Sequence, residues 1–189
     1  MAFTSSIFLF AFFPLAVIFY FLVPSKNKNT ALFIISILFY AFWRIDHTFL
    51  LIFSILIDFY CGKKIFSSKK NKKFFLCLSL ASNLGILFYF KYCYFLGQNI
   101  NVLFDYFSIS TLSISKSALP LGVSFFTFQT MSYSIDIYNS KILPAKKIRD
   151  FATYVVMFPQ LIAGPIVRYS EVKDDLSRSR KPQYQLFLH

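Results

Sequence analysis

Residues 158–169 read Phe-Pro-Gln-Leu-Ile-Ala-Gly-Pro-Ile-Val-Arg-Tyr, and this stretch decides how the chain can fold. It is apolar enough to enter a membrane. However, Pro159 and Pro165 prevent one continuous helix, because each proline removes a backbone donor and clashes with the preceding turn. Gly164 adds backbone freedom between them. Broken backbone at membrane depth is tolerated only where it is buried in protein or lines a wet cavity. The stretch therefore predicts part of a site rather than a plain lipid-facing span.

The composition indicates a protein in contact with membrane lipid. Of the 189 residues, 57% are hydrophobic and 21% are aromatic, a balance that is rare in soluble domains. The net charge of +12 would indicate nucleic acid in a soluble protein. Here the basic residues form short clusters between apolar runs, which is the pattern that orients membrane proteins. We therefore expect no nucleic-acid partner, and the wide spacing of Cys61, Cys77 and Cys93 predicts no metal site.

The apolar runs predict an all-α, polytopic transmembrane helical bundle of about five spans, and residues 1–189 are expected to form a single membrane domain with no separate soluble domain. The expected spans are Ile7–Val23, Thr30–Trp43, Thr48–Tyr60, Phe74–Phe90 and Leu119–Tyr138. The first run lacks the features of a cleavable signal peptide, so we expect it to be retained. The second and third are short and are expected to form a tight pair. By the positive-inside rule, the lysine-rich segment Gly62–Lys73 is expected in the cytoplasm. The N-terminus is then expected on the outer side.

The segment Tyr92–Phe107 is expected to lie in the membrane interface rather than to cross. At 100° per residue, Gln98, Asn101 and Asp105 fall within about 60° of one another, while apolar side chains fill most of the remaining surface. If this segment does not cross, the basic loop that follows Tyr138 remains in the cytoplasm, as the charge rule requires.

The segment Asp150–Ala163 is expected to be a re-entrant or deeply buried element entered from the cytoplasm. Asp150 is the expected N-cap of its helix. At the helical rise the segment is only about 21 Å long, which is too short to span. The following Ser170–His189 is polar and is predicted to be a surface segment.

The run Leu119–Tyr138 is polar on two faces of its predicted helix. One stripe holds Gln129, Ser132 and Asp136, and the other holds Thr127, Thr130 and Ser134. Such a helix belongs inside a bundle or beside a cavity. Asp136 is a functional candidate as an intramembrane carboxylate, unless it pairs with Arg149 or a lysine. Gln129 either lines a cavity or fixes packing through an interhelical hydrogen bond.

Residues 158–169 resemble a signature of the membrane-bound O-acyltransferase (MBOAT) family, in the branch that O-acetylates alginate and peptidoglycan. A second block matches the same branch, with Leu-Pro-Leu-Gly-Val-Ser-Phe-Phe-Thr-Phe-Gln at 119–129 and Ser-Tyr-Ser-Ile-Asp-Ile-Tyr at 132–138. The resemblance extends loosely through Phe39–Trp43 and Lys91–Tyr92. It implies an incomplete MBOAT-like fold in the bacterial inner membrane. It also implies an acyl thioester donor such as acetyl-CoA as co-substrate, no bound cofactor, and a periplasmic O-acetyltransferase partner that acetylates a cell-envelope polysaccharide.

In this interpretation the broken segment forms part of the wall of a passage through the bilayer. The passage-lining or substrate-lining candidates are Gln129, Ser132, Asp136, Pro159, Gln160, Gly164, Pro165 and Arg168. Gln160 has a structural alternative, in which it hydrogen-bonds backbone groups freed by the two prolines. Arg168 either attracts an anionic acyl donor or reaches toward lipid phosphate.

The resemblance also implies a histidine base within a Trp-His motif, and this chain offers no match for it. Its two histidines are His47, in a short turn between two spans, and His189; neither follows a tryptophan. We therefore expect no catalytic residue in this chain, no activity of the chain alone, and a truncated product that corresponds to the N-terminal part of a typical member. Two alternatives remain open: a fragment of a transporter or channel, and a membrane assembly protein without chemistry.

Overall fold

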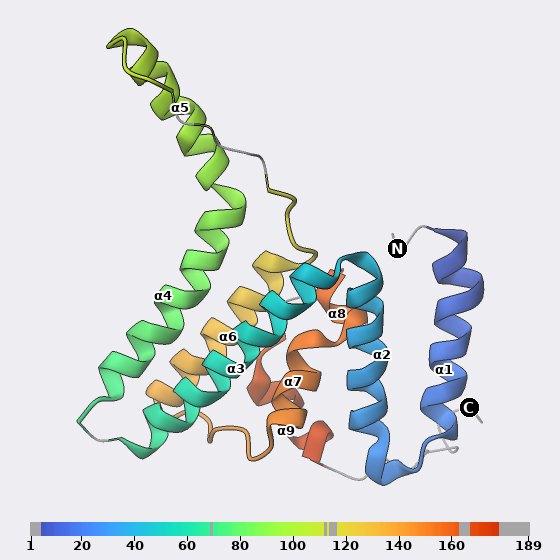
Figure 1. Cartoon of the computed structure of the whole chain (residues 1–189). Coiled ribbons are helices and arrows are strands. Elements are labelled where there is room, and N and C mark those ends of the chain that lie inside the picture. Colours follow the sequence, from blue (N-terminus) through green and yellow to red (C-terminus); the bar gives the residue numbers. More distant parts are fainter. Residues whose placement is uncertain (1–4, 69, 112, 114–116, 163–166, 178–189) are drawn as a thin grey trace.

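The computed structural model describes residues 5–68, 70–111, 113, 117–162 and 167–177, and within these ranges the chain is all-α (Figure 1). The helices are η1 Phe8–Phe12, α1 Phe13–Leu22, η2 Ser25–Asn27, α2 Lys28–Trp43, α3 Ile45–Ser67, α4 Lys72–Lys91, α5 Cys93–Tyr106, α6 Val123–Tyr138, α7 Ile148–Val156, α8 Phe158–Ile162 and α9 Tyr169–Ser177. The predicted fold class is confirmed at this level. The runs expected over Ile7–Val23, Thr30–Trp43 and Phe74–Phe90 are helical as predicted.

Helix α3 is longer than the run Thr48–Tyr60 predicts, because it includes residues on both sides of that run. It begins at Ile45 and continues to Ser67, so the first part of the expected lysine-rich loop is helical. Lys63 lies over the ring of Phe59, with Nζ 4.5 Å from the ring centroid. A cation one turn from an aromatic ring stabilises the helix, and lysine is itself a good helix former. Charge at this end of α3 therefore does not end the helix.

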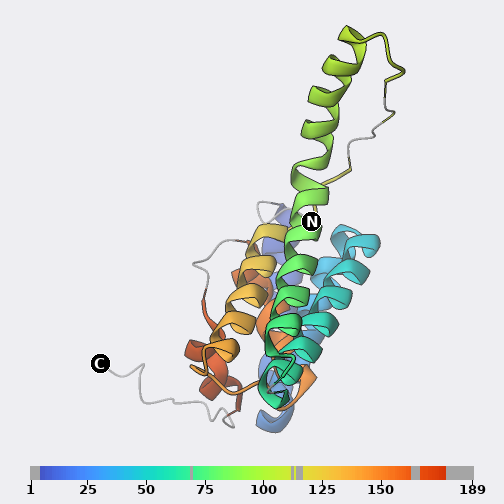
Figure 2. The same ribbon diagram turned by 90° about the vertical axis from the view of Figure 1, so that its left-hand side faces the viewer.

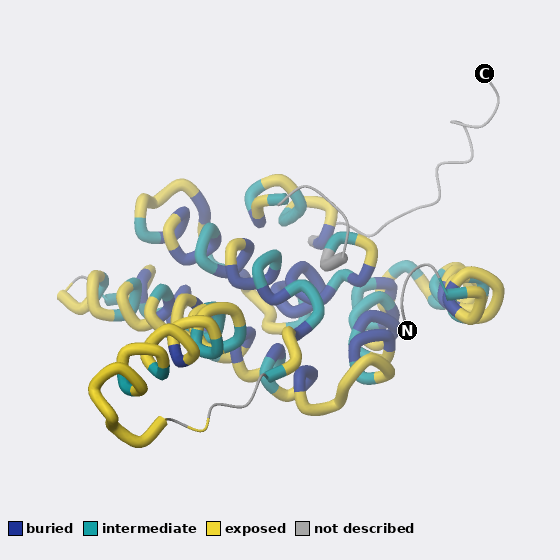
Figure 3. Tube along the Cα trace, turned by 90° about the horizontal axis from the view of Figure 1, so that it is seen from above, coloured by how far each residue is buried: buried dark blue, intermediate teal, exposed yellow. Residues whose placement is uncertain are grey.

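The core forms where α3, α4 and α6 pack against one another and α7 fills the space between α2, α3 and α6. Its fully buried large side chains include Tyr40, Leu51, Phe126, Tyr133, Phe151 and Tyr154. Helix α1 packs on α2 through a smaller aromatic cluster of Phe8, Phe12, Phe39 and Phe158. Figure 3 shows that burial concentrates on α7 and its neighbours, whereas α1 and α5 are largely exposed.

Helix α6 begins at Val123 rather than at Leu119. Gly122, the N-cap, has a φ of 65°, a left-handed conformation that glycine adopts without steric cost. The hydroxyl of Tyr40 donates to the carbonyl oxygen of Leu121 at 2.8 Å, which ties this entry turn to α2. The segment with the Pro120 and Gly122 pair is therefore a turn that positions α6.

The helix predicted over Asp150–Ala163 is two helices, α7 and α8, which meet at Met157. Pro159 is the second residue of α8, a position where its missing donor is not needed. The backbone N–H of Phe158 donates to Oγ of Ser36 at 3.3 Å. The proposed N-cap was wrong: Lys147 is the N-cap of α7, and Asp150 lies in its first turn. The expectation of a deeply buried element is confirmed for Phe151–Val156.

Three connections lie at the same end of the bundle: those between α1 and α2, α3 and α4, and α6 and α7 (Figure 1). Helix α9 lies at this end too, whereas α8 lies deeper in the bundle. The chain thus enters the bundle along α7, and α9 lies at the end where it entered. The three connections carry most of the basic clusters in the sequence.

The segment expected to lie in the membrane interface forms helix α5, and its place relative to a membrane stays a prediction. Figures 1 and 2 show that it continues outward from α4 in nearly the same direction and projects beyond the other helices. Among the described helices, only α4 is long enough and apolar enough to cross a membrane, judged by length and composition alone. The segment Phe8–Leu22 is apolar but shorter.

Candidate functional site

The first candidate is a buried polar cluster, which we call the Asp58 cluster. It contains Ser54 and Asp58 on α3, Ser79 and Asn83 on α4, and Thr130 and Ser134 on α6. In each pair the two residues are four apart in sequence, so they lie on the same face of their helix. All six are buried. The cluster therefore lies where the three core helices meet.

Among the described residues, Asp58 accepts hydrogen bonds only from neutral donors. Oγ of Ser79 donates to Asp58 Oδ1 at 2.6 Å, and Nδ2 of Asn83 lies 2.9 Å from both carboxyl oxygens. Oγ of Ser134 lies 2.7 Å from Oγ of Ser79. Because the Ser79 hydrogen points to Asp58, Ser134 is the donor of this second bond. In the part of the chain that the structure describes, no cationic side chain lies within ion-pair distance of Asp58.

The remaining capacity of Asn83 is also used. Its Oδ1 accepts from Oγ1 of Thr130 at 2.9 Å and faces Oγ of Ser54 at 3.4 Å. Each buried polar atom of the Asp58 cluster thus has a partner. Such a satisfied network specifies how helices fit together, since a misaligned helix would leave buried polar groups unpaired. We assign this cluster to the fold rather than to ligand binding.

Asp58 and its partners on α3 and α4 are not among the residues that the sequence pattern predicts for a site. The stripe of Thr130 and Ser134 was identified, and the structure shows that it faces this cluster. The sequence does contain a signal for this cluster, because Asp58 is a carboxylate within an apolar run. A carboxylate in such a run is expected to have a polar partner. Ser79 and Asn83 at helical spacing in the next run would have supplied it.

The other polar face of α6 is less completely satisfied. Gln129 is 2% exposed, and its Oε1 has no hydrogen-bond partner in the described part of the chain. Oγ of Ser132 donates to the backbone carbonyl of Gln129 at 2.7 Å. Asp136 is buried, but its expected partner Arg149 instead donates to Asp150 and to Thr30, at 3.3 and 3.0 Å. The alternative in which Asp136 pairs with Arg149 or a lysine is therefore not seen among the described residues.

The passage-lining candidates within residues 158–169 differ in their exposure. Pro159 is exposed, whereas Gln160 is half-buried with a buried Nε2 that has no hydrogen-bond partner among the described residues. The suggested bonds from this amide to freed backbone groups are thus not seen there. Arg168 is exposed immediately before α9. Gly164 and Pro165 lie outside the described residues. Because α6 contacts α8, Gln129 and Gln160 belong to neighbouring helices.

His47 does not lie in a turn between two spans, which corrects the prediction. It lies in the first turn of α3 and is 5% exposed, because its ring packs edge-on against Phe90 with centroids 5.8 Å apart. Its Nδ1 has no hydrogen-bond partner among the described residues. A buried ring without an orienting partner is poorly placed to act as a general base. His189 lies outside the described residues.

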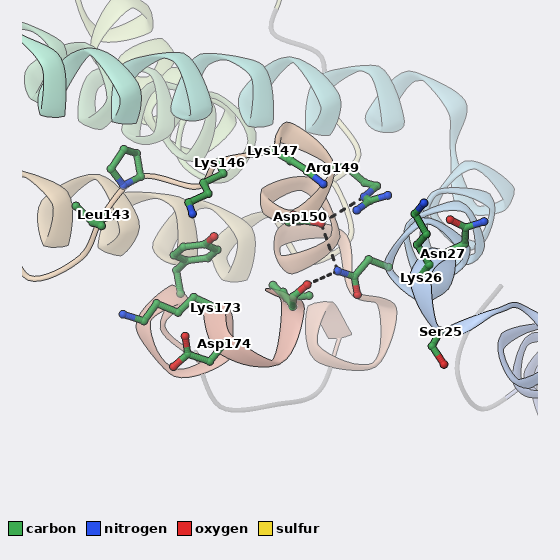
Figure 4. Close-up of a pocket in the computed structure, with 14 residues that line it drawn as sticks. Ser25, Lys26, Asn27, Leu143, Lys146, Lys147, Arg149, Asp150, Lys173 and Asp174 are labelled. Atoms are coloured by element: carbon green, nitrogen blue, oxygen red, sulfur yellow. Dashed lines mark hydrogen bonds and ion pairs between the residues drawn. The ribbon is translucent and has the colours of Figure 1, made fainter. Parts of the chain in front are cut away.

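The second candidate is a cavity of about 860 Å³ at the end of the bundle that carries the basic connections (Figure 4). We call it the basic pocket. Its charged lining consists of Lys26, Lys146, Lys147, Arg149, Lys173, Asp150 and Asp174. From the sequence, most of these basic residues indicate only the orientation of the chain in a membrane. The pocket cannot be predicted from a local pattern, because its lining comes from segments far apart in sequence.

The polar network beside the basic pocket occupies Asp150. Its Oδ1 accepts from Nδ2 of Asn29 and from Nε of Arg149, both at 3.3 Å. Asn29 also donates to the carbonyl of Leu176, which joins α2 to α9. Tyr169 lines the same cavity. Burial, and to a lesser degree the nearby Asp150, raise the pKa of the Tyr169 hydroxyl to about 12, so it is a neutral hydroxyl at physiological pH.

Comparison with known proteins identifies relatives of this chain. It is 33% identical over 180 residues to the probable alginate O-acetylase AlgI of Azotobacter vinelandii, which covers 94% of this chain and 36% of the relative. The corresponding protein of Pseudomonas aeruginosa is 34% identical over 182 residues, covering 94% of this chain and 35% of the relative. The peptidoglycan O-acetyltransferase of Helicobacter pylori is 32% identical over 201 residues, covering 90% and 37%.

No protein-family model matches the chain, and no solved structure gives a significant match. The chain spans little more than a third of the length of the curated relatives it matches. Over nearly its whole length, the chain is a homologue of part of the alginate O-acetylases and peptidoglycan O-acetyltransferases, the MBOAT branch that its sequence motifs resemble.

Proposed function

We propose that this chain forms the N-terminal scaffold and passage part of a membrane-bound O-acyltransferase that takes part in O-acetylation of a cell-envelope polysaccharide, such as alginate or peptidoglycan. The homology over 94% of the chain to alginate O-acetylases carries the proposal. The chain spans only about a third of the length of those relatives, and the proposal assigns the acetylation activity to the larger protein rather than to this part alone.

The proposed setting is the bacterial inner membrane, crossed by α1, α2, α3, α4 and α6. The span-like α4 and the exposed apolar surface of α1 support it. The gathering of the basic connections at one end of the bundle also supports it, since this end would face the cytoplasm under the positive-inside rule. In this orientation α7 and α8 enter from the cytoplasm, as a re-entrant element would.

The proposed passage runs beside α6 and α8. Support comes from Gln129 Oε1 and Gln160 Nε2, two buried amide atoms left without partners among the described residues. Unpaired buried polar atoms are costly, so they favour a site that a polar group fills during function. An amide N–H such as that of Gln160 can donate to the carbonyl of an acyl thioester.

The chemical step is assigned to residues outside this chain. Attack of a hydroxyl on a thioester needs a base that takes the hydroxyl proton as the new ester bond forms and the thiolate leaves. His47 is not placed to do so. The base, the acetyl-CoA-like donor and a periplasmic O-acetyltransferase partner are therefore parts of the proposal that follow from the family resemblance.

A chimera tests this proposal. The matching third of the Pseudomonas aeruginosa relative is replaced by this chain, and the O-acetyl content of the secreted alginate is measured by proton NMR. We expect acetylation from the chimera and none from this chain or the remaining two thirds alone. Turnover by this chain alone would disprove the assignment of the base. A chimera that reaches the membrane at normal levels but leaves alginate unacetylated would disprove the scaffold role.

A further inference from the structure

The proposed function makes no use of the basic pocket, although several elements combine to build it. Lys26 comes from η2, Lys146 and Lys147 from the connection between α6 and α7, and Lys173 from α9. Figure 4 draws these four lysines among the residues that line the cavity, with Lys26 on the far side of Arg149 and Asp150 from Lys146 and Lys173. Segments more than a hundred residues apart therefore bring like charges together.

The charge of the pocket is not balanced from within. Five cationic side chains line it against two carboxylates, Asp150 and Asp174. Asp150 is already bonded to Arg149 and Asn29, and Asp174 is also engaged. Among the described residues, no carboxylate oxygen lies within ion-pair distance of any of the four lysines. Gathering like charges costs energy, and a multiply charged anion would offset that cost.

The pocket also holds neutral hydrogen-bond donors among these cations. Ser25, Asn27 and Tyr169, whose side chains carry hydroxyl or amide donors, line the same cavity. Ammonium groups supply point charge to phosphate oxygens, and hydroxyl and amide donors satisfy the oxygens that remain. The volume of about 860 Å³ lies within the usual range for small-molecule sites.

We propose that the basic pocket is a binding site for phosphate esters, held chiefly by Lys146, Lys147 and Lys173. The phosphate can belong to a soluble molecule or to the head group of an anionic lipid, and the lysines recognise the same chemistry in both. The proposal stands on the pocket alone and does not rest on the acyl-transfer function. Its failure would leave that function untouched, and the reverse also holds.

The test uses the full chain in nanodiscs of phosphatidylcholine. Binding of inorganic pyrophosphate and of adenosine 3′,5′-bisphosphate is measured by isothermal titration calorimetry. A second arm measures enrichment of phosphatidic acid over phosphatidylcholine on the purified chain by native mass spectrometry. The pocket variant is Lys146→Gln/Lys147→Gln/Lys173→Gln. The matched control is Lys70→Gln/Lys73→Gln/Lys141→Gln, which removes the same charge from exposed lysines outside the pocket.

We expect the pocket variant to weaken binding about tenfold or more and the control by less than about twofold. Loss of soluble-phosphate binding identifies a soluble ligand, and loss of phosphatidic acid enrichment alone identifies a lipid. Circular dichroism checks that both variants remain folded. If the wild-type chain binds none of the three probes, or if pocket and control variants weaken binding equally, the site does not exist.

Discussion

The Asp58 cluster and the basic pocket are both rich in polar side chains, but they use them in opposite ways. In the Asp58 cluster the carboxylate, the amide of Asn83 and the hydroxyls around them satisfy one another. In the basic pocket four lysines line a cavity without a carboxylate partner among the described residues. Polar groups that satisfy one another's hydrogen bonds fix a fold, whereas polar groups without such partners can bind a ligand.

The comparison also explains where each region lies. The Asp58 cluster is built from positions four residues apart on three helices, so any shift of α3, α4 or α6 would break several bonds at once. The basic pocket is built mainly from connections and the short helix α9. Connections tolerate an unbalanced charge because water reaches them. Substitutions should therefore affect stability in the first region and binding in the second.

The largest effect is expected from Asn83→Leu. This change removes both hydrogen bonds from Nδ2 to Asp58 and leaves a buried carboxyl group poorly satisfied. We expect a loss of about 3–5 kcal/mol in the free energy of unfolding. The check is thermal unfolding of the chain in detergent, followed by fluorescence. Leu84→Ala, at a half-exposed neighbouring position on α4, is the control and should change little. An unchanged midpoint for Asn83→Leu would show that the cluster does not hold the helices together.

A smaller loss is expected from Gly62→Ala, at the contact between α3 and α6. An added Cβ would lie 2.7 Å from Cε1 of Tyr133. That ring is fully buried, and its hydroxyl accepts from the backbone N–H of Ala145 at 3.0 Å, so it cannot easily move away. We expect a destabilisation of about 1–3 kcal/mol, measured by the same thermal unfolding.

Gly85→Ala on α4 is the matched control for Gly62→Ala, because nothing lies within 4 Å of its added Cβ. Alanine should stabilise that helix by about 0.5–1 kcal/mol through its higher helix propensity. Equal effects of the two substitutions would contradict the close packing of α3 on α6.

Salt should separate the two regions. Raising sodium chloride from about 50 to about 500 mM shortens the range of charge interactions, so binding of pyrophosphate to the basic pocket should weaken several-fold. The Asp58 cluster is buried from salt and its described partners are neutral, and salt relieves repulsion among the clustered lysines, so the unfolding midpoint without ligand should not fall. Binding that is insensitive to salt would argue against recognition by the lysines.

The smallest effect is expected from Arg168→Gln. The sequence singles this residue out as an attractor of anions, but its side chain is exposed and does not line the basic pocket. We expect pyrophosphate binding to change by less than about twofold, since an exposed charge outside the site is screened by water. Calorimetry on the full chain measures it. A loss as large as that of the Lys146→Gln/Lys147→Gln/Lys173→Gln variant would place the anion site at Arg168 instead.

Much of the secondary structure follows from the sequence. The apolar runs located most of the long helices, and Pro159 correctly indicated broken backbone near residue 158. The lysines after Tyr60 predict a loop, but α3 continues through them. Packing at Gly62 and the cation–π contact of Lys63 stabilise these helical residues. The break fell at Met157 because Pro159 fits the first turn of a new helix.

The two polar regions were harder to predict, because each depends on pairs distant in sequence. Asp58 meets Ser79 and Asn83 only through the packing of α3 on α4, which no local pattern contains. The basic pocket unites Lys26 with Lys146 and Lys173, whose charges already had an explanation in membrane orientation. Gln129 and Gln160 were identified from the sequence, and their unpaired amide atoms fit the passage proposed for them.

The contrast between a satisfied and an open polar region is tested most directly by the thermal unfolding midpoint of the Lys146→Gln/Lys147→Gln/Lys173→Gln variant, measured with and without pyrophosphate. Pyrophosphate should raise the wild-type midpoint by stabilising the bound state. We predict that the ligand-free midpoint of the variant is no lower than that of the wild type, because repulsion among the lysines is relieved, and that it shows no rise with pyrophosphate. A variant whose ligand-free midpoint falls as far as that of Asn83→Leu, and which still responds to pyrophosphate, would contradict the distinction.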